Sequence, residues 1–321
     1  MTTPHERMAT LTLKSPAKLN LVLDILRKRA DGFHEVEFVM QELELHDLIT
    51  IETFFVPTGP GVNSAMPHRK IEIICTDPSV PLDERNTCWK AVELMRKEER
   101  KKYESMLHAS WRDTDAVRIY IEKHIPSAGG LGGGSSNAAT VLKGLNQLWD
   151  LQLSNEKLSE LAAQIGSDTP FFIYGGTCIA TGRGEIITPL KEKCPTLHLA
   201  FIVPPVKVPA AKTKWIYGNF DVQKVETHYS ITEMHHALQQ QSAEKVIEKM
   251  GNVFENLTLQ EYELVFELIA KLNYMPGIHK AMLAGAGPTV VAVCEDEKVA
   301  SQVIAPFRMQ GWIAFATHTA H

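Results

Sequence analysis

The stretch of sequence from residue 125 to residue 139 reads IPSAGGLGGGSSNAA and decides the fold. Five of the six residues at 129–134 are glycine. Glycine loses more conformational freedom on folding than any other residue, so such a run persists where the backbone adopts unusual dihedral angles or approaches a ligand closely. The run therefore predicts a loop whose backbone meets a ligand, and phosphate is the first candidate.

The residues on either side of the glycines support an anion site. Residues 117–123 alternate between apolar and polar side chains, as a strand does. The residues after the loop have apolar side chains at helical spacing, and Ser135, Ser136 and Asn137 suit the cap and first turn of a helix. A loop that leads into a helix N-terminus favours an anion, because unpaired N–H groups and the positive end of the helix dipole meet there.

Two common phosphate-binding motifs do not fit this stretch. The Walker motif needs a lysine before its serine or threonine, and Gly134 precedes Ser135. A dinucleotide fingerprint that begins at Gly130 would need its third glycine at position 135, and no clear acidic partner follows about 20 residues further on. A glycine-rich connection with no ligand is the remaining alternative, and the strand, loop, helix and hydroxyl groups together favour the anion site over it.

Composition limits the class of protein. A chain of 321 residues with 44% hydrophobic and 22% charged residues predicts a globular protein with two domains. The formal net charge of -5 argues against a nucleic-acid partner, which usually requires a basic surface. No apolar run is long enough for a membrane span, and residues 1–10 lack a signal core, so we expect a cytoplasmic protein with no membrane partner.

Cysteines and histidines give no sign of a metal site. The five cysteines are scattered without a C-x-x-C pair, so neither a disulfide framework nor a zinc site is predicted and buried thiols are expected. His34 lies beside Asp31 and Glu35, but no second pair of ligands has suitable spacing.

The N-terminal strand carries two polar residues on one face. Its apolar residues alternate from Leu11 to Ile25, and Lys18 and Asn20 fall on the opposite face from Leu19 and Leu21. Lys18 and Asn20 are therefore expected to point the same way.

Three further motifs accompany the glycine loop, and they are SPAKLNL at 15–21, RADGFHE at 29–35 and GSDTPFF at 166–172. Together with the loop they resemble the GHMP kinase superfamily, and within it the kinases that act on 4-diphosphocytidyl-2-C-methyl-D-erythritol. The resemblance covers most of the chain, from about Lys14 to Val293, and their order and spacing agree as well. The combination is far more specific than any one motif.

The resemblance implies an α+β protein with the two-domain GHMP kinase fold. Its N-terminal ATP-binding domain, an α/β domain like domain 2 of ribosomal protein S5, would span residues 9–192. A ferredoxin-like α+β domain on the substrate side would span residues 193–321. A monomer or a homodimer is expected.

The resemblance also assigns roles to residues. ATP, with Mg2+, would be held by Pro126, Gly129, Gly130, Leu131, Gly132, Gly133, Gly134, Ser135 and Ser136, and either serine could reach the phosphates or the metal. Lys18 and Asp168 would be catalytic, with Asp168 as general base and Lys18 as the matching cation. Asn20, Phe33, His34 and Gly285 would bind the substrate, a small molecule that contains cytidine diphosphate. Each role has a purely structural alternative. Asp168 would then be a surface carboxylate, Lys18 a lysine at a strand edge, Phe33 a packed core residue and His34 a residue that satisfies its turn.

Several positions depart from the pattern of the resembled kinases. Phe33 stands where tyrosine is common, which keeps an aromatic ring but loses a hydroxyl group. Ala284 and Ala286 replace serines in a third glycine motif at 284–289, and Ala210 lies where a hydroxyl residue is common. These departures leave open another GHMP kinase that acts on a sugar, homoserine or a mevalonate-like alcohol, or a catalytically silent binding protein.

Further elements are expected from periodicity. Segments 56–69 and 98–111 look longer than the resembled kinases usually carry. The remaining strands and helices are predicted from the spacing of their apolar side chains and from cap and turn residues. Strands are expected at 38–51, within 171–188, at 197–203 and at 290–294, and helices at 86–106, 156–165, 232–248 and 260–271, with a final helix after 294.

Overall fold

The computed structural model describes residues 7–54, 70–105, 116–127, 129–209 and 212–320. The expected long segment at 56–69, part of that at 98–111 and Ala210 lie outside these residues. The chain forms two compact units, and each unit gathers three separate stretches of sequence. The first holds residues 1–15, 46–127 and 133–173, and the second holds residues 16–45, 128–132 and 174–321. The predicted domains, 9–192 and 193–321, divide the chain at one point and so differ from these interleaved units. That domain boundary stays a prediction.

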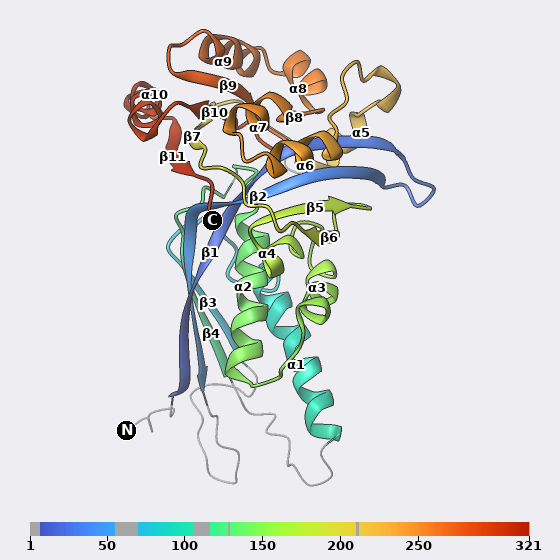
Figure 1. Ribbon diagram of the computed structural model, residues 1–321. Coiled ribbons are helices and arrows are strands. Elements are labelled where there is room, and N and C mark those ends of the chain that lie inside the picture. Colours follow the sequence, from blue (N-terminus) through green and yellow to red (C-terminus); the bar gives the residue numbers. More distant parts are fainter. Residues whose placement is uncertain (1–6, 55–69, 106–115, 128, 210–211, 321) are drawn as a thin grey trace. The chain divides into compact units, whose positions relative to one another are not determined.

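The strands follow the expected order with four additional short strands (Figure 1). Their bounds are β1 Arg7–Lys28, β2 His34–Phe54, β3 Ile71–Cys75, β4 Ala116–Glu122, β5 Thr177–Thr181, β6 Ile186–Pro189, β7 His198–Val203, β8 Gly251–Asn252, β9 Ile278–Leu283, β10 Val290–Cys294 and β11 Ile313–His318. Strands β3, β8, β9 and β11 were given no predicted range, because each has six residues or fewer and so offers little periodicity.

The helices match the prediction less closely. Their bounds are α1 Thr87–Ser105, α2 Gly133–Leu148, α3 Asn155–Ala163, α4 Phe171–Tyr174, α5 Lys212–Asn219, α6 Ile231–Gln239, α7 Ala243–Lys249, α8 Glu255–Glu261, α9 Glu263–Asn273 and α10 Glu297–Met309, with a 3-10 turn at Val222–Lys224. The single helix expected at 232–248 is two helices, because Gln241 has a positive φ of 52° and Ser242 then caps a new helix by accepting a bond from Lys245 N–H.

Two more expectations were wrong for local reasons. The residues at 171–174 form a short helix rather than a strand, since the backbone turns after Pro170 and Phe172 N–H bonds Thr169 O. Likewise, the helix expected at 260–271 is divided at Tyr262 between α8 and α9.

In the first unit, strands and helices enclose an apolar core. The end of β2 pairs antiparallel with β4, and β4 pairs parallel with β3. Helix α2 lies close against β2, because a Cβ placed on Gly144 would fall only 2.4 Å from Ile51 Cδ1. Helices α1 and α2 pack together (Figure 1). This packing fixes the direction in which α2 begins, directly after the glycine loop.

The second unit contains two sets of paired strands. The start of β2 pairs with β5, β5 pairs with β6, and β1 pairs parallel with β8. A four-stranded sheet has the order β11-β7-β10-β9, and helices α9 and α10 contact its strands. Residues buried in this sheet include Phe201, Val291 and Leu283.

All five cysteines are free thiols, as expected. Cys75 is half-buried and the other four are buried. Burial raises the pKa of Cys88, Cys178 and Cys194 to about 12, so these thiols stay protonated near neutral pH. Among the described residues, no helix is long and apolar enough to cross a membrane.

Candidate active site

The front of the glycine loop is fastened to strand β1 within the second unit. Lys18 donates its backbone N–H to Leu131 O at 3.0 Å, and the Leu131 side chain is buried. Gly130 and Gly132, on either side of Leu131, have positive φ angles of 71° and 74°. Only glycine adopts such angles without strain, so these two glycines let the buried leucine anchor the loop to β1.

The third glycine motif meets the same loop. A Cβ on Gly285, whose φ is 55°, would lie 3.2 Å from Gly130 O. Asn252 holds this motif in place, since its Nδ2 donates to Leu283 O at 2.9 Å and to Gly285 O at 2.7 Å. Asn252 could not be identified from local sequence, because its partners lie more than thirty residues away.

Lys18 and Asn20 point the same way from β1, as the alternation predicted. Lys18 Nζ donates to Asn20 Oδ1 at 3.0 Å, and both side chains are buried. A buried ammonium loses its hydration, so a polar partner such as this amide offsets part of the cost.

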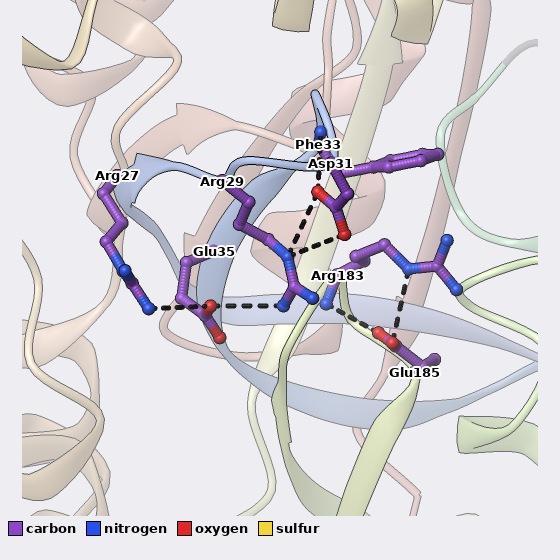
Figure 2. Close-up of polar contacts among 7 residues, drawn as sticks. All are labelled: Arg27, Arg29, Asp31, Phe33, Glu35, Arg183 and Glu185. Atoms are coloured by element: carbon purple, nitrogen blue, oxygen red, sulfur yellow. Dashed lines mark hydrogen bonds and ion pairs between the residues drawn. The ribbon is translucent and has the colours of Figure 1, made fainter.

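Phe33 is presented by a tight turn of charged residues between β1 and β2 (Figure 2). Asp31 Oδ1 accepts the backbone N–H of Phe33 at 3.1 Å, and Arg29 bridges Asp31 and Glu35 at 3.2 Å each. The Phe33 ring is 52% exposed, and the Arg183 guanidinium lies 4.7 Å from its centre. The turn thus presents an aromatic ring to solvent with a cation against it.

His34, the next residue, turns inward. Its side chain is buried, and its ring centre lies 5.4 Å from that of Tyr217. Burial, with a contribution from the Lys28 charge, lowers the pKa of His34 below its ordinary value of 6.5. His34 is therefore neutral at physiological pH and can both donate and accept a hydrogen bond. Tyr217 was missed from the sequence, although an aromatic pair at Trp215 and Tyr217 was visible there.

The other end of the glycine loop begins helix α2 in the first unit. The helix starts at Gly133, so Ser135 and Ser136 both belong to its first turn and Asn137 follows. Ser136 is fully buried, and its Oγ accepts a bond from Ser15 Oγ at 2.8 Å. Ser135 is partly exposed and Gly134 is exposed. The part of this turn that reaches solvent is therefore Gly133, Gly134 and Ser135.

Asp168 lies in the turn that follows α3, in the same unit. Helix α3 ends at Ala163 with Gln164 as its cap, so Gly166 belongs to the turn rather than to the cap. A Cβ on Gly166 would lie 3.9 Å from Ser135 Oγ, which brings this turn beside the first turn of α2. Phe171 and Phe172 are buried and anchor the turn, and Asp168 is partly exposed. Two motifs separated by thirty residues thus meet in the first unit.

No group of three or more histidine, cysteine or carboxylate side chains that could hold a metal ion is present in the described part of the chain. A site that binds Mg2+ through phosphate oxygens needs only one or two carboxylates from the protein. The turn that carries Asp168 beside Ser135 fits that kind of site.

Comparison with known proteins identifies the class. The GHMP kinases N terminal domain matches residues 86–176, and the GHMP kinases C terminal domain matches residues 234–310. The chain belongs to the GHMP kinase family. Its fold is the two-domain GHMP kinase fold of mixed α and β structure, which confirms the predicted fold class.

The relatives have a more specific name. Proteins named 4-diphosphocytidyl-2-C-methyl-D-erythritol kinase from Brevibacillus brevis and Geobacillus thermodenitrificans are each 38% identical over 287 residues, which is 89% of this chain and 88% and 89% of theirs. One from Microcystis aeruginosa is 36% identical over 97% of this chain and 98% of its own.

Solved structures show the same fold. A crystal structure of 4-(cytidine 5'-diphospho)-2C-methyl-D-erythritol kinase has a TM-score of 0.73 at 23% identity, and covers 97% of this chain and 100% of that one. Homoserine kinase from Cytophaga hutchinsonii has a TM-score of 0.65 at 15% identity, over 99% and 97% of the two chains.

Proposed function

We propose that this chain is an ATP-dependent kinase that phosphorylates the 2-hydroxyl group of 4-diphosphocytidyl-2-C-methyl-D-erythritol. The relatives at 34–38% identity that carry this substrate in their name support the choice of alcohol. The structural observation that carries the proposal is the bond from Lys18 N–H to Leu131 O, which joins the glycine loop to the strand of Lys18 and Asn20.

The glycine loop is the proposed site of the ATP phosphates. Backbone N–H groups at the start of α2 have no partner within the helix, and they suit the phosphate oxygens of a nucleotide. Ser135 is the serine proposed to contact phosphate, because Ser136 is buried and bonded to Ser15. Mg2+ would be held by phosphate oxygens with the Ser135 hydroxyl, and it would neutralise phosphate charge.

The proposed reaction needs one proton acceptor and one cation. The substrate hydroxyl oxygen bonds to the γ-phosphorus as the bond from that phosphorus to the bridging oxygen breaks, and ADP leaves. Asp168 is proposed to take the hydroxyl proton, a role that contributes about 10²- to 10⁴-fold in rate. Lys18 is proposed to stabilise the negative charge of the transferred group, with its ammonium oriented by Asn20.

The cytidine base is proposed to bind at the turn of Phe33 and His34. Arg183 covers one part of the Phe33 ring, and a base can stack on aromatic surface that remains exposed. Neutral His34 can recognise the hydrogen-bonding edge of cytosine, since it offers a donor and an acceptor.

A substrate panel tests this proposal. Purified protein with ATP and Mg2+ is given 4-diphosphocytidyl-2-C-methyl-D-erythritol, homoserine, mevalonate or galactose, and ADP release is followed. The proposal expects release with the cytidine compound alone. Turnover of one of the other alcohols in preference to it would overturn the choice of substrate, and binding of ATP without turnover of any would favour a silent binding protein.

A further inference from the structure

Asp47 is a carboxylate that the sequence did not single out. It lies on β2, and its side chain has no exposed surface. Its Oδ1 accepts the backbone N–H groups of His124 and Ile125 at 2.7 and 2.8 Å. Its Oδ2 accepts a bond from Lys123 Nζ and another, at 2.8 Å, from Asn137 Nδ2. Four donors thus converge on one buried carboxylate.

These donors come from the two sides of the glycine loop. Three belong to residues 123–125, directly before Pro126, and the fourth belongs to Asn137 on α2, directly after the loop. Asn137 Nδ2 also donates to Ser15 Oγ at 2.9 Å, and Ser15 in turn donates to Ser136. The whole network lies within the first compact unit. Asp47 therefore ties the entry of the loop to its exit.

The packing around Gly133 shows how closely this tie controls the loop. A Cβ on Gly133 would lie 3.1 Å from Lys123 Nζ and 3.2 Å from Ile125 Cγ2. The first residue of α2 thus rests on the ammonium group that Asp47 holds. If that group moved, the start of the helix would lose its support.

We propose that Asp47 is a positioning residue for nucleotide binding, which sets the backbone N–H groups of the glycine loop at the spacing that phosphate requires. Because Asp47 is fully buried, it acts through the loop and not by touching the nucleotide. A buried charge network of this kind is rigid when every member is satisfied, and it is disturbed when one member loses its partner. The proposal rests on the proposed role of the loop in holding ATP.

The Asp47→Asn variant is the direct test. An amide oxygen at the Oδ1 position keeps the two backbone bonds, but an amide nitrogen at the Oδ2 position faces two donors, Lys123 and Asn137. We expect the Kd for ATP, measured by titration calorimetry, and the KM for ATP to rise about tenfold, equivalent to about 1.4 kcal/mol. The KM for the alcohol should change less than twofold.

A second substitution provides the rescue. In the double variant Asp47→Asn with Asn137→Asp, the new amide donates to the new carboxylate at position 137, which removes one of the two donor–donor contacts that the single variant creates. Affinity for ATP should return to within about threefold of the unsubstituted protein. Asn137→Ala is a further variant, which leaves the ion pair of Asp47 and Lys123 intact and should still weaken ATP binding severalfold.

The matched control is Ile49→Ala, two residues further along β2. Ile49 is also fully buried but has only apolar side-chain atoms, so its loss should lower the melting temperature without changing the Kd for ATP. If Asp47→Asn and Asn137→Ala lower the melting temperature as Ile49→Ala does, yet leave the Kd for ATP within twofold, Asp47 is only structural and the proposal is wrong.

The binding measurement separates this proposal from the proposed function. A protein that binds ATP but phosphorylates no alcohol would refute the kinase assignment, and Asp47 would still be tested by the Kd for ATP. A protein that turns over the cytidine substrate with an unchanged Kd in the variants would refute the role of Asp47 alone.

Discussion

Gly285→Ala offers a quantitative test of the contact between the third glycine motif and the glycine loop. Gly285 has a φ of 55°, and a Cβ there would lie 3.2 Å from Gly130 O. A left-handed backbone costs a residue with a Cβ about 1–2 kcal/mol. In addition, the new methyl group must push the Gly130 carbonyl by a few tenths of an ångström, because the gap is tighter than an ordinary contact.

The two effects can be separated by a control variant. Gly311 has a φ of 79°, and a Cβ there would meet nothing within 4 Å. Gly311→Ala should therefore lose a similar amount of unfolding free energy, about 1–2 kcal/mol, measured in urea. Its activity should stay unchanged. Gly285→Ala should also lose kcat/KM for ATP by about tenfold, since misplacement of 1 Å near a reacting group costs about 10²-fold. Equal kcat/KM for ATP in the two variants would show that the contact of Gly285 with Gly130 does not position the loop.

Two further predictions concern the turn of Phe33 and His34, which is the proposed site of the cytidine base. The free energy of unfolding should fall as the pH drops below 6.5, because the unfolded chain takes up a proton at His34 before the folded protein does. His34→Asn should flatten this dependence in urea titrations between pH 5 and pH 8. An unchanged slope would show that His34 is not held neutral. In steady-state assays, Arg183→Ala should raise the KM for the cytidine substrate by about two- to fivefold, because the cation against the Phe33 ring contributes about 0.5–1 kcal/mol. The KM for ATP should stay unchanged. A change in the KM for ATP alone would contradict this role.

Local patterns predicted the elements around the glycine loop well. The strand before the glycine run, the helix after it and the common orientation of Lys18 and Asn20 all follow from the period of side chains along a strand or helix. The short helix at 171–174 could not be predicted in this way, since a short apolar run fits a strand as well as a turn of helix.

The supporting residues could not be predicted, because they act over long distances in the sequence. Asp47 accepts a bond from Asn137, ninety residues further along the chain, and Asn252 holds a motif about thirty residues away. Hydrogen bonds of this kind depend on how elements far apart in the sequence pack against one another, and the local pattern of side chains does not encode that packing. The loop was visible in the sequence, whereas the network that holds it appears only in the fold.

The most direct test of the kinase assignment is phosphorus NMR of the product. Carbon 2 of the proposed substrate carries a methyl group and no hydrogen, so a phosphate on its hydroxyl should give a phosphomonoester resonance without three-bond coupling to a proton. We expect this signal, in equal amount to ADP, for the unsubstituted protein, and its loss in Asp168→Asn while ATP still binds. A coupled resonance would place the phosphate on another hydroxyl, and full activity in Asp168→Asn would show that Asp168 is not the base; either result would overturn the proposed reaction.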